Sequence, residues 1–337
     1  MRYGFWAPVF GGWLRNVRDE GMRADWDYMR ALCLRAEEIG YDLTLIAELN
    51  LNDIKGVHEP ALDAWSTAAA LAAVTSRLEL MVAVRPNFHQ PALFAKQAAN
   101  ISLISGGRLS LNVVSSWWEE EAKSYGLAFD RHDDRYARTR EWLAVVDGLW
   151  REPRFSFAGE RYQLEGAICE PKPKARPILY AGGESEAAKT LIAERCDAFV
   201  MHGDAPDVIA GKIADMRTRR ARASGAPMVF GMAAYAIVRG TREEALAEAA
   251  RITTLDPTAP GFANFSQWIG GTELERALKI EEYSVSNRGL RPGLIGAADH
   301  VRARIAEYEA AGVDLLLLQM SPQLEEMERF ADAVIAA

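Results

Sequence analysis

Short apolar runs alternate with helical patterns along most of this chain, and that alternation limits the folds it can adopt. The apolar runs are centred near residues 5, 45, 82, 112, 179, 199, 234 and 316, and the last three extend over Ala198–Met201, Val229–Val238 and Leu315–Gln319. Between them, apolar residues recur at helical spacing over Trp26–Ile39, Ala61–Ala73, Pro91–Ile104 and Tyr136–Leu149. Strands that alternate with helices form a parallel sheet, and eight of them predict a (β/α)8 barrel of the α/β class.

Polar residues stand where the apolar runs stop. The segment Ser105–Ser116 is typical of a helix end, a glycine turn and a buried strand, followed by two serines. Arg85 ends an earlier run, and Gly182–Ser185 ends a later one. Because barrel enzymes carry their chemistry at the carboxyl ends of the strands, we expect one site that collects polar groups from several strands.

The composition is that of a globular protein and narrows the possible partners. A chain of 337 residues with 49% hydrophobic residues can form one large barrel, and we expect a single domain over residues 1–337. The net charge of -8 argues against nucleic acid or an anionic membrane as the main partner. No apolar run reaches the roughly 18 residues of a membrane span, and no signal peptide is recognisable. We therefore expect a cytoplasmic enzyme.

Two long insertions interrupt the alternation, over residues 150–176 and 250–295. The first contains Phe155–Tyr162, a pattern typical of a small hairpin, and the second is predicted to be a mobile lid. The three cysteines are scattered and odd in number, which favours buried thiols over disulfides or zinc ligands.

The glycine pair Gly182–Gly183, with Ser185, lies between a predicted strand and a predicted helix. Two glycines there let the backbone approach a phosphate at the helix N-terminus. The same residues also fit an ordinary turn in which Ser185 caps the helix.

Asn112 and Ser115 lie at the end of the fourth predicted strand. An asparagine amide offers a donor and an acceptor together, as the edge of a heterocycle requires, although it could equally satisfy loop backbone. The adjacent Trp117 and Trp118 could form a wall for an aromatic ligand or cover the mouth of the barrel.

The histidines do not have the spacing of a metal site, and no metal is expected. His89 and His202 follow strand ends and could reach the site, or they could be structural. The chain has no Gly-x-Ser-x-Gly elbow and no Walker lysine loop, so we expect a bound cofactor to carry any difficult reaction.

Three arginines are the remaining candidates for residues that bind a substrate. Arg85 lies on a predicted strand, whereas Arg288 and Arg291 lie in the second insertion. One fixed and two mobile guanidinium groups would suit a tetrahedral oxyanion. Surface salt bridges are the alternative explanation for each of them.

Taken in order, these motifs resemble the bacterial luciferase-like family of flavin-dependent monooxygenases over essentially the whole chain. The group that the sequence resembles most contains alkanesulfonate, methanesulfonate and dimethylsulfone monooxygenases, with pyrimidine monooxygenases as more distant relatives. The matching segments are Tyr3–Pro8, Gly106–Ser115, His132–Tyr136, Gly182–Ser185, Leu294–Gly296 and Gly312–Leu318.

The resemblance implies a (β/α)8 barrel that uses reduced FMN from a separate NAD(P)H-dependent flavin reductase, O2 as cosubstrate, and a homodimer or homotetramer. It places Asn112 on the isoalloxazine ring, with Ser115 beside it, and gives Glu48, Glu121 and Tyr136 further flavin contacts. It places Gly182, Gly183 and Ser185 on the 5′-phosphate.

The resemblance also implies a substrate. The pair Arg85–Pro86 matches the sulfonate branch, which favours a small anionic sulfonate whose C–S bond is broken to release sulfite and an aldehyde. Ala61, Ala233 and Tyr235 replace polar residues of the alkanesulfonate enzymes, so a more polar sulfonate, such as the sulfosugar sulfoquinovose, is conceivable.

In this interpretation Arg85, with Arg288 or Arg291, binds the sulfonate, and His89, His202 or Tyr235 donates or accepts protons during the reaction. The alternatives are a dimethylsulfone-type or pyrimidine-type monooxygenase, a deazaflavin-dependent dehydrogenase and a non-catalytic flavin-binding relative.

Overall fold

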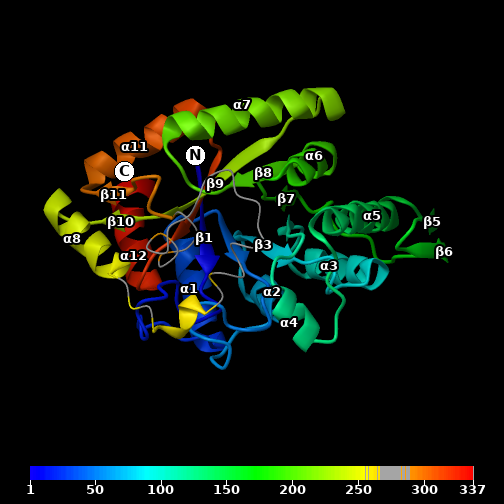
Figure 1. Ribbon diagram of the computed structural model, residues 1–337, viewed down its shortest axis with the longest axis horizontal. Helices are drawn as coiled ribbons and strands as arrows, with labels where there is room; N and C mark the ends of the chain where they lie inside the picture. Colours follow the sequence, from blue (N-terminus) through cyan, green and yellow to red (C-terminus); the bar gives the residue numbers. More distant parts are fainter. Residues whose placement is uncertain are drawn as a thin grey trace.

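Eight parallel strands form a closed barrel in this computed structural model, which describes residues 1–254, 256, 258–263, 265, 282, 285 and 289–336. The order around the barrel is β1-β12-β9-β8-β7-β4-β3-β2. The predicted (β/α)8 barrel is therefore confirmed (Figure 1). The strands are β1 (Arg2–Ala7), β2 (Leu43–Ile46), β3 (Glu79–Val84), β4 (Leu109–Val113), β7 (Leu179–Ala181), β8 (Ala198–Met201), β9 (Val229–Tyr235) and β12 (Leu315–Gln319).

Helices surround the strands (Figure 1). Local sequence signals set their limits: Asp25 caps α1 through a hydrogen bond from Tyr28 N (2.8 Å), and Pro91 begins α3. The helices are α1 (Trp26–Glu38), α2 (Ala64–Val74), α3 (Pro91–Ile104), α4 (Glu119–Ser124), α5 (His132–Arg151), α6 (Glu186–Arg195), α7 (Pro206–Ala223), α8 (Arg242–Thr253), α11 (Ala298–Ala311) and α12 (Gln323–Phe330). Two short helical segments, η1 (Pro260–Phe262) and η2 (Ala331–Ile335), also lie among the described residues.

The inside of the barrel is filled with side chains. One buried cluster consists of strand residues alone: Leu43, Leu45, Met81, Tyr180, Ala198, Leu315 and Leu317. Gly4 faces the same interior, since a Cβ there would lie 2.7 Å from Leu43 Cγ. The larger cluster joins the outward side chains of the strands to the helices. A packed interior leaves only the two ends of the barrel for binding.

Two segments leave the barrel. The predicted strand over residues 229–238 is divided, because β10 (Ile237–Val238) pairs with β11 (Ile295–Gly296) outside the barrel. The predicted hairpin is confirmed: β5 (Phe155–Ala158) and β6 (Gln163–Ala167) are antiparallel, and Figure 1 shows them projecting to one side. Most of the predicted lid, including Arg288, lies outside the described residues. The single domain remains a prediction.

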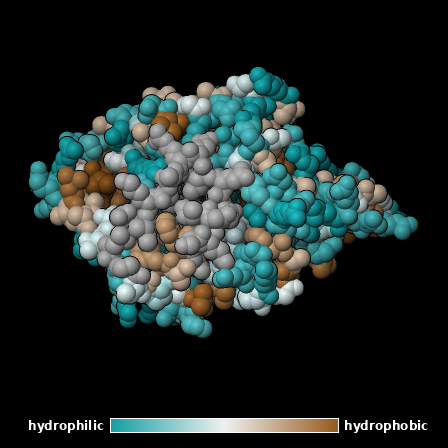
Figure 2. Space-filling model, in the orientation of Figure 1, coloured by the Kyte–Doolittle hydropathy of each residue, from teal (hydrophilic) through white to brown (hydrophobic). Residues whose placement is uncertain are grey.

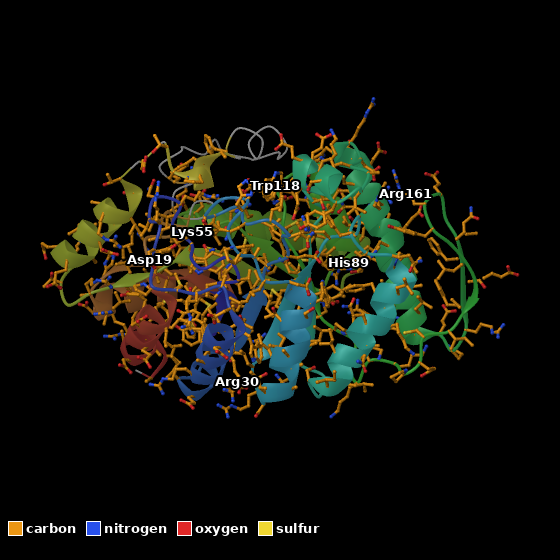
Figure 3. The ribbon with its side chains drawn as sticks, turned by 90° about the horizontal axis from the view of Figure 1, so that it is seen from below. Asp19, Arg30, Lys55, His89, Trp118 and Arg161 are labelled. Carbon is orange, nitrogen blue, oxygen red and sulfur yellow. The ribbon has the colours of Figure 1, made fainter. Side chains whose placement is uncertain are left out.

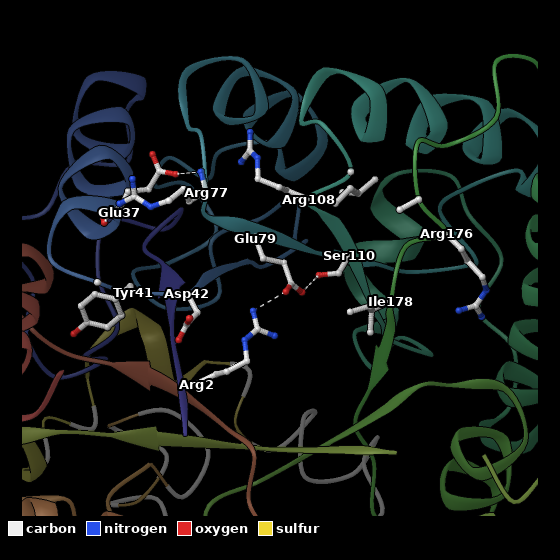
Figure 4. A pocket seen from close by; sticks show the side chains of 14 residues that line it. Arg2, Glu37, Tyr41, Asp42, Arg77, Glu79, Arg108, Ser110, Arg176 and Ile178 are labelled. Carbon is white, nitrogen blue, oxygen red and sulfur yellow. Dashed lines mark hydrogen bonds and ion pairs between the residues drawn. The ribbon is translucent and has the colours of Figure 1, made fainter. Parts of the chain in front are cut away.

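The amino end of the barrel holds a pocket of about 560 Å³ in which charges are paired (Figure 4). Arg2 points toward Glu79, and their charged atoms are 2.8 Å apart. Arg108 donates to the carbonyl oxygens of Ala72 and Thr75. Arg77 likewise bonds the backbone of Glu37, and Arg176 bonds Asp147 and Asp197. Each of these arginines therefore already has an acceptor within the protein.

Large exposed apolar side chains are scattered over the described surface, with Leu93 (73% exposed) on α3 and Leu246 (49%) on α8. Figure 2 likewise shows brown patches separated by hydrophilic surface on the face turned to the reader. Among the described residues, no helix is both long and apolar enough to cross a membrane.

Candidate active site

A pocket of about 200 Å³ lies at the carboxyl ends of the strands. It brings together Glu48, Arg85 and Asn112, which follow or end β2, β3 and β4. The structure thus brings polar groups from three strand ends into one pocket. Figure 3 shows His89 and Trp118 well away from Arg30, which lies on the outer helix α1. The rest of the lining is Trp6, Phe10, Trp13, Arg15, Leu45, Ala47, Leu49, Asp53, Ile54, Ala83, Val114, Trp117 and Gln319.

Neutral hydrogen-bonding groups line this pocket. The indole Nε1 of Trp6 is buried and has no hydrogen-bond partner among the described residues. Asn112 and Gln319 add side-chain amides, each of which can donate and accept. Sequence reasoning missed Trp6 because it lies within an apolar run. It also missed Gln319, although that residue ends its strand and Asn112 is the last but one residue of its own.

Arg85 is held by two carboxylates. Its side chain is 2% exposed, and both terminal nitrogens bind the carboxylate of Glu121, with Nη2 3.2 Å from Oε1. Its Nε lies 3.6 Å from Glu48 Oε2, and its guanidinium carbon lies 3.8 Å above the ring of Phe88. Glu121, fully buried, also accepts from Asn50 N at 2.5 Å. The charge of Arg85 is thus compensated without a ligand.

Glu48 is fixed by three donors. Its Oε1 accepts from Trp65 Nε1 (3.0 Å) and lies 2.5 Å from His89 Nε2, and its Oε2 accepts from Arg85 N (2.7 Å). A carboxylate only accepts, so Nε2 of His89 carries a proton in this contact. Trp142 Nε1 in turn donates to the carbonyl of His89 at 2.9 Å. The Glu48–His89 pair is therefore a rigid unit that can hold a proton beside the pocket.

A second group of predicted residues meets where β7 leads into α6. A Cβ on Gly183, whose φ is +153°, would lie 2.6 Å from Ala188 Cβ and 3.5 Å from Tyr136 Oη. A Cβ on Gly182 would lie 2.7 Å from the carbonyl oxygen of Val200. Ser185 Oγ accepts from Ala188 N at 3.2 Å and caps α6. The loop thus exposes backbone at a helix N-terminus, as an anion site requires.

Comparison with known proteins agrees with this geometry. The family model described as luciferase-like monooxygenase matches residues 1–315. The chain belongs to the luciferase-like monooxygenase family. The resemblance inferred from the ordered motifs is therefore confirmed.

Two curated proteins are similar to this luciferase-like chain over nearly its whole length. An FMNH2-dependent dimethylsulfone monooxygenase from Pseudomonas fluorescens (strain Pf0-1) is 32% identical over 344 residues, which cover 99% of this chain and 93% of that protein. Another of the same description, from Pseudomonas putida, is 31% identical over 99% of this chain and 94% of its own. The solved structure of DmoA from Hyphomicrobium sulfonivorans shares the fold, with a TM-score of 0.82, 20% identity and coverage of 99% and 86%.

Several predicted residues of this luciferase-like protein lie outside the pocket lining. Ser115 lines a separate small cavity together with Asn87, and its Oγ lies 3.0 Å from Thr139 Oγ1. Tyr235 is 2% exposed in an apolar cluster with Leu14 and Ile252, and burial raises its pKa well above 10. His202 directly follows β8.

Arg291 lies between two carboxylates. Its Nη2 is 2.9 Å from Glu282 Oε2 and its Nη1 is 3.6 Å from Asp204 Oδ2. Both partners favour the charged form, and the hydrogen bond to Glu282 is the first cause of the raised pKa of Arg291. The part of the chain described here thus places Arg291 near the end of β8 and not in the pocket lining.

Proposed function

We propose that this protein is an FMNH2- and O2-dependent monooxygenase that oxidises a small organosulfur compound at the carbon next to sulfur and so breaks the C–S bond. The observation that carries the proposal is the pocket at the carboxyl ends of the strands, whose arginines are paired with carboxylates and which also holds neutral donors. A glycine loop suited to a phosphate follows β7 at the same end of the barrel. The two FMNH2-dependent dimethylsulfone monooxygenases of similar sequence support it.

The described residues fit FMN. At Gly182 and Gly183 a Cβ would collide with Val200 and Ala188, so the loop keeps bare backbone at the N-terminus of α6, where the 5′-phosphate would lie near Ser185 and Tyr136. Asn112 supplies an amide to the heterocycle, and Trp6 supplies an unpartnered N–H. Reduced FMN, when bound, supplies the electrons with which one oxygen atom of O2 is transferred to substrate and the other leaves as water.

A neutral sulfone suits this pocket best. Arg85 is paired with Glu121 and Arg15 with Asp53, so an entering anion would meet no uncompensated cation among the described residues. The N–H groups of Gln319, and of Trp6 where the flavin does not accept from it, can instead donate to sulfone oxygens. Hydroxylation of a methyl group of dimethylsulfone gives an unstable hydroxymethyl sulfone, which breaks down to methanesulfinate and formaldehyde.

An organosulfonate, a sulfosugar included, is the second candidate, because Arg85 does line the pocket. Hydroxylation next to the sulfonate sulfur would release sulfite and an aldehyde. In either case the Glu48–His89 pair would hold a proton beside the reacting atoms. A separate NAD(P)H-dependent flavin reductase would supply the reduced flavin, and the homodimer or homotetramer remains a prediction.

The test is to incubate the protein with FMN, a flavin reductase and NADH, and to offer dimethylsulfone or methanesulfonate. Formaldehyde measures oxidation of either compound, whereas methanesulfinate and sulfite tell the two apart. Catalase is included, and omission of the reductase is the control. We expect formaldehyde with methanesulfinate from dimethylsulfone. FMNH2 binding without product from either compound would refute C–S cleavage of dimethylsulfone and methanesulfonate and leave the sulfosugar, pyrimidine-type, deazaflavin and non-catalytic alternatives.

A further inference from the structure

Arg85 is a cation at the wall of the pocket whose charge is cancelled from behind. The residue lines the pocket, but its partner Glu121 does not; Glu121 approaches from the first turn of α4 and is fully buried. The two are 36 residues apart in the chain and form a bidentate pair. Bidentate carboxylate–guanidinium pairs in a buried setting hold their geometry strongly.

The other carboxylate near Arg85 is already shared. Glu48 lies 3.6 Å from Arg85 Nε, but its two oxygens also accept from Trp65, His89 and the backbone N of Arg85. If Glu121 lost its charge, Arg85 would keep only this longer contact and its position above Phe88. An arginine in that state would attract an anion entering the pocket.

We infer that Glu121 determines the charge specificity of the pocket: by neutralising Arg85 it makes a site that prefers a neutral sulfone over an anion of the same shape. This inference rests on the proposed function, because it concerns the substrate of that site. Glu121 acts through Arg85 and is therefore a positioning residue. Its hydrogen bond from Asn50 N, on the loop after β2, keeps the carboxylate in place.

Dimethylsulfone and methanesulfonate are the matched probes, since they differ by a methyl group in place of a charged oxygen. Binding of each is measured by calorimetry with the FMN-loaded protein and no reductase, so turnover does not enter the result. We expect the natural protein to bind dimethylsulfone about tenfold or more tightly than methanesulfonate. Equal or tighter binding of methanesulfonate would overturn the inference.

Three variants sharpen the test. Glu121→Gln should shift the affinity ratio about tenfold or more toward methanesulfonate. Glu120→Gln, an exposed position on the same helix, should keep the original ratio. The double variant Arg85→Gln with Glu121→Gln removes both charges and should also keep the preference for dimethylsulfone. Comparing it with Glu121→Gln shows whether the gain in affinity for methanesulfonate comes from Arg85.

Each result decides something. A folded Glu121→Gln variant with an unchanged ratio would overturn the inference even if the enzyme makes methanesulfinate. Should Glu121→Gln fail to fold, the natural protein and the double variant decide, because both are expected to prefer dimethylsulfone. Binding of neither probe to any protein would overturn both this inference and the proposed substrate. Product formation together with the expected ratios supports both.

Discussion

Trp6 and Arg85 line the same pocket but differ in how far their polar atoms are satisfied. Both terminal nitrogens of Arg85 have a carboxylate partner and only its Nε lacks a hydrogen bond, whereas the buried Nε1 of Trp6, its one polar side-chain atom, has none among the described residues. Folded proteins leave few buried donors unpaired, so those that remain call for an explanation. A ligand acceptor that meets the indole N–H would provide one.

Substituting Trp6→Phe tests this explanation. We expect the free energy of unfolding to change by less than about 1 kcal/mol, because no existing hydrogen bond is lost. The affinity for dimethylsulfone or FMN should fall about fivefold or more, since the ligand loses a donor. Trp13→Phe is the contrasting control: Trp13 Nε1 donates to Gln323 Oε1 at 2.8 Å, so that change should cost stability. A Trp6→Phe protein with both affinities unchanged would disprove a role for the indole N–H.

Gly183→Ala tests the phosphate loop. The new Cβ would lie 2.6 Å from Ala188 Cβ, and the positive φ disfavours any side chain, so the loop must shift. We expect the dissociation constant of FMN to rise about tenfold or more, which corresponds to about 1.4 kcal/mol, as measured by fluorescence titration. Gly211→Ala on α7 is the control, because nothing lies within 4 Å of its Cβ. It should leave FMN binding unchanged, and equal affinities in both variants would count against the loop.

At the scale of elements, α1 is tied to the segment before β3 by one carboxylate. Glu37 accepts from the backbone N–H groups of Ser76 (2.8 Å), Arg77 and Leu78 (2.7 Å). Burial alone would raise the pKa of Glu37, but these three donors outweigh it and the pKa is lowered from 4.5. A lowered pKa means that the carboxylate stabilises the folded protein above pH 4.5 and that this contribution is lost as the pH falls below that value.

Glu37→Gln should therefore cost about 1–2 kcal/mol at pH 7, because an amide oxygen accepts more weakly than a carboxylate. The difference from the natural protein should shrink at pH 4, where the carboxylate begins to be protonated. Urea unfolding at the two pH values measures both quantities. Glu38→Gln, at an exposed neighbouring position, should change stability by less than about 0.5 kcal/mol. A difference that is the same at both pH values would argue against the assigned role.

Elements with strong local signals could be predicted to the residue. Pro91 fixed the start of α3, and uninterrupted apolar runs set the limits of β8 and β12. The start of α5 was placed too late, because its first turn begins with exposed polar residues that are not part of the apolar face. The division of the run over 229–238 depends on its pairing with β11, and a run of apolar residues does not reveal its partner.

At the scale of the whole molecule, a residue of the candidate site could be predicted when its place at a strand end was enough to locate it. A contact between two segments far apart in the sequence could not be predicted. Glu48, Arg85 and Asn112 each end or follow an apolar run, so their place at the pocket could be read from the sequence. The sequence could not show that Arg85 meets Glu121, which is 36 residues away. The charge that a pocket presents to a ligand depends on which charged side chains form ion pairs, and these pairs form only when the barrel has closed.

The reactivity of the three cysteines can be used to follow the opening of the whole barrel. Cys33 in α1, Cys169 after β6 and Cys196 before β8 are free and buried. Burial, reinforced by the charge of Asp197, raises the pKa of Cys196 to about 12, and burial also raises that of Cys33 and Cys169. Since the thiolate is the reactive form, all three should be nearly inert in the folded protein at pH 8.

We therefore expect Ellman's reagent to label fewer than one thiol per chain in the native state within minutes, and all three in guanidinium chloride. Slow native labelling should then follow the opening of the barrel, so the rate should fall when FMN is bound, if FMN binds the folded state alone. The natural protein and Gly183→Ala, each with and without FMN, separate this effect from chemical protection of a single cysteine. Rapid stoichiometric labelling of the native protein would show that at least one of these segments opens without unfolding of the barrel.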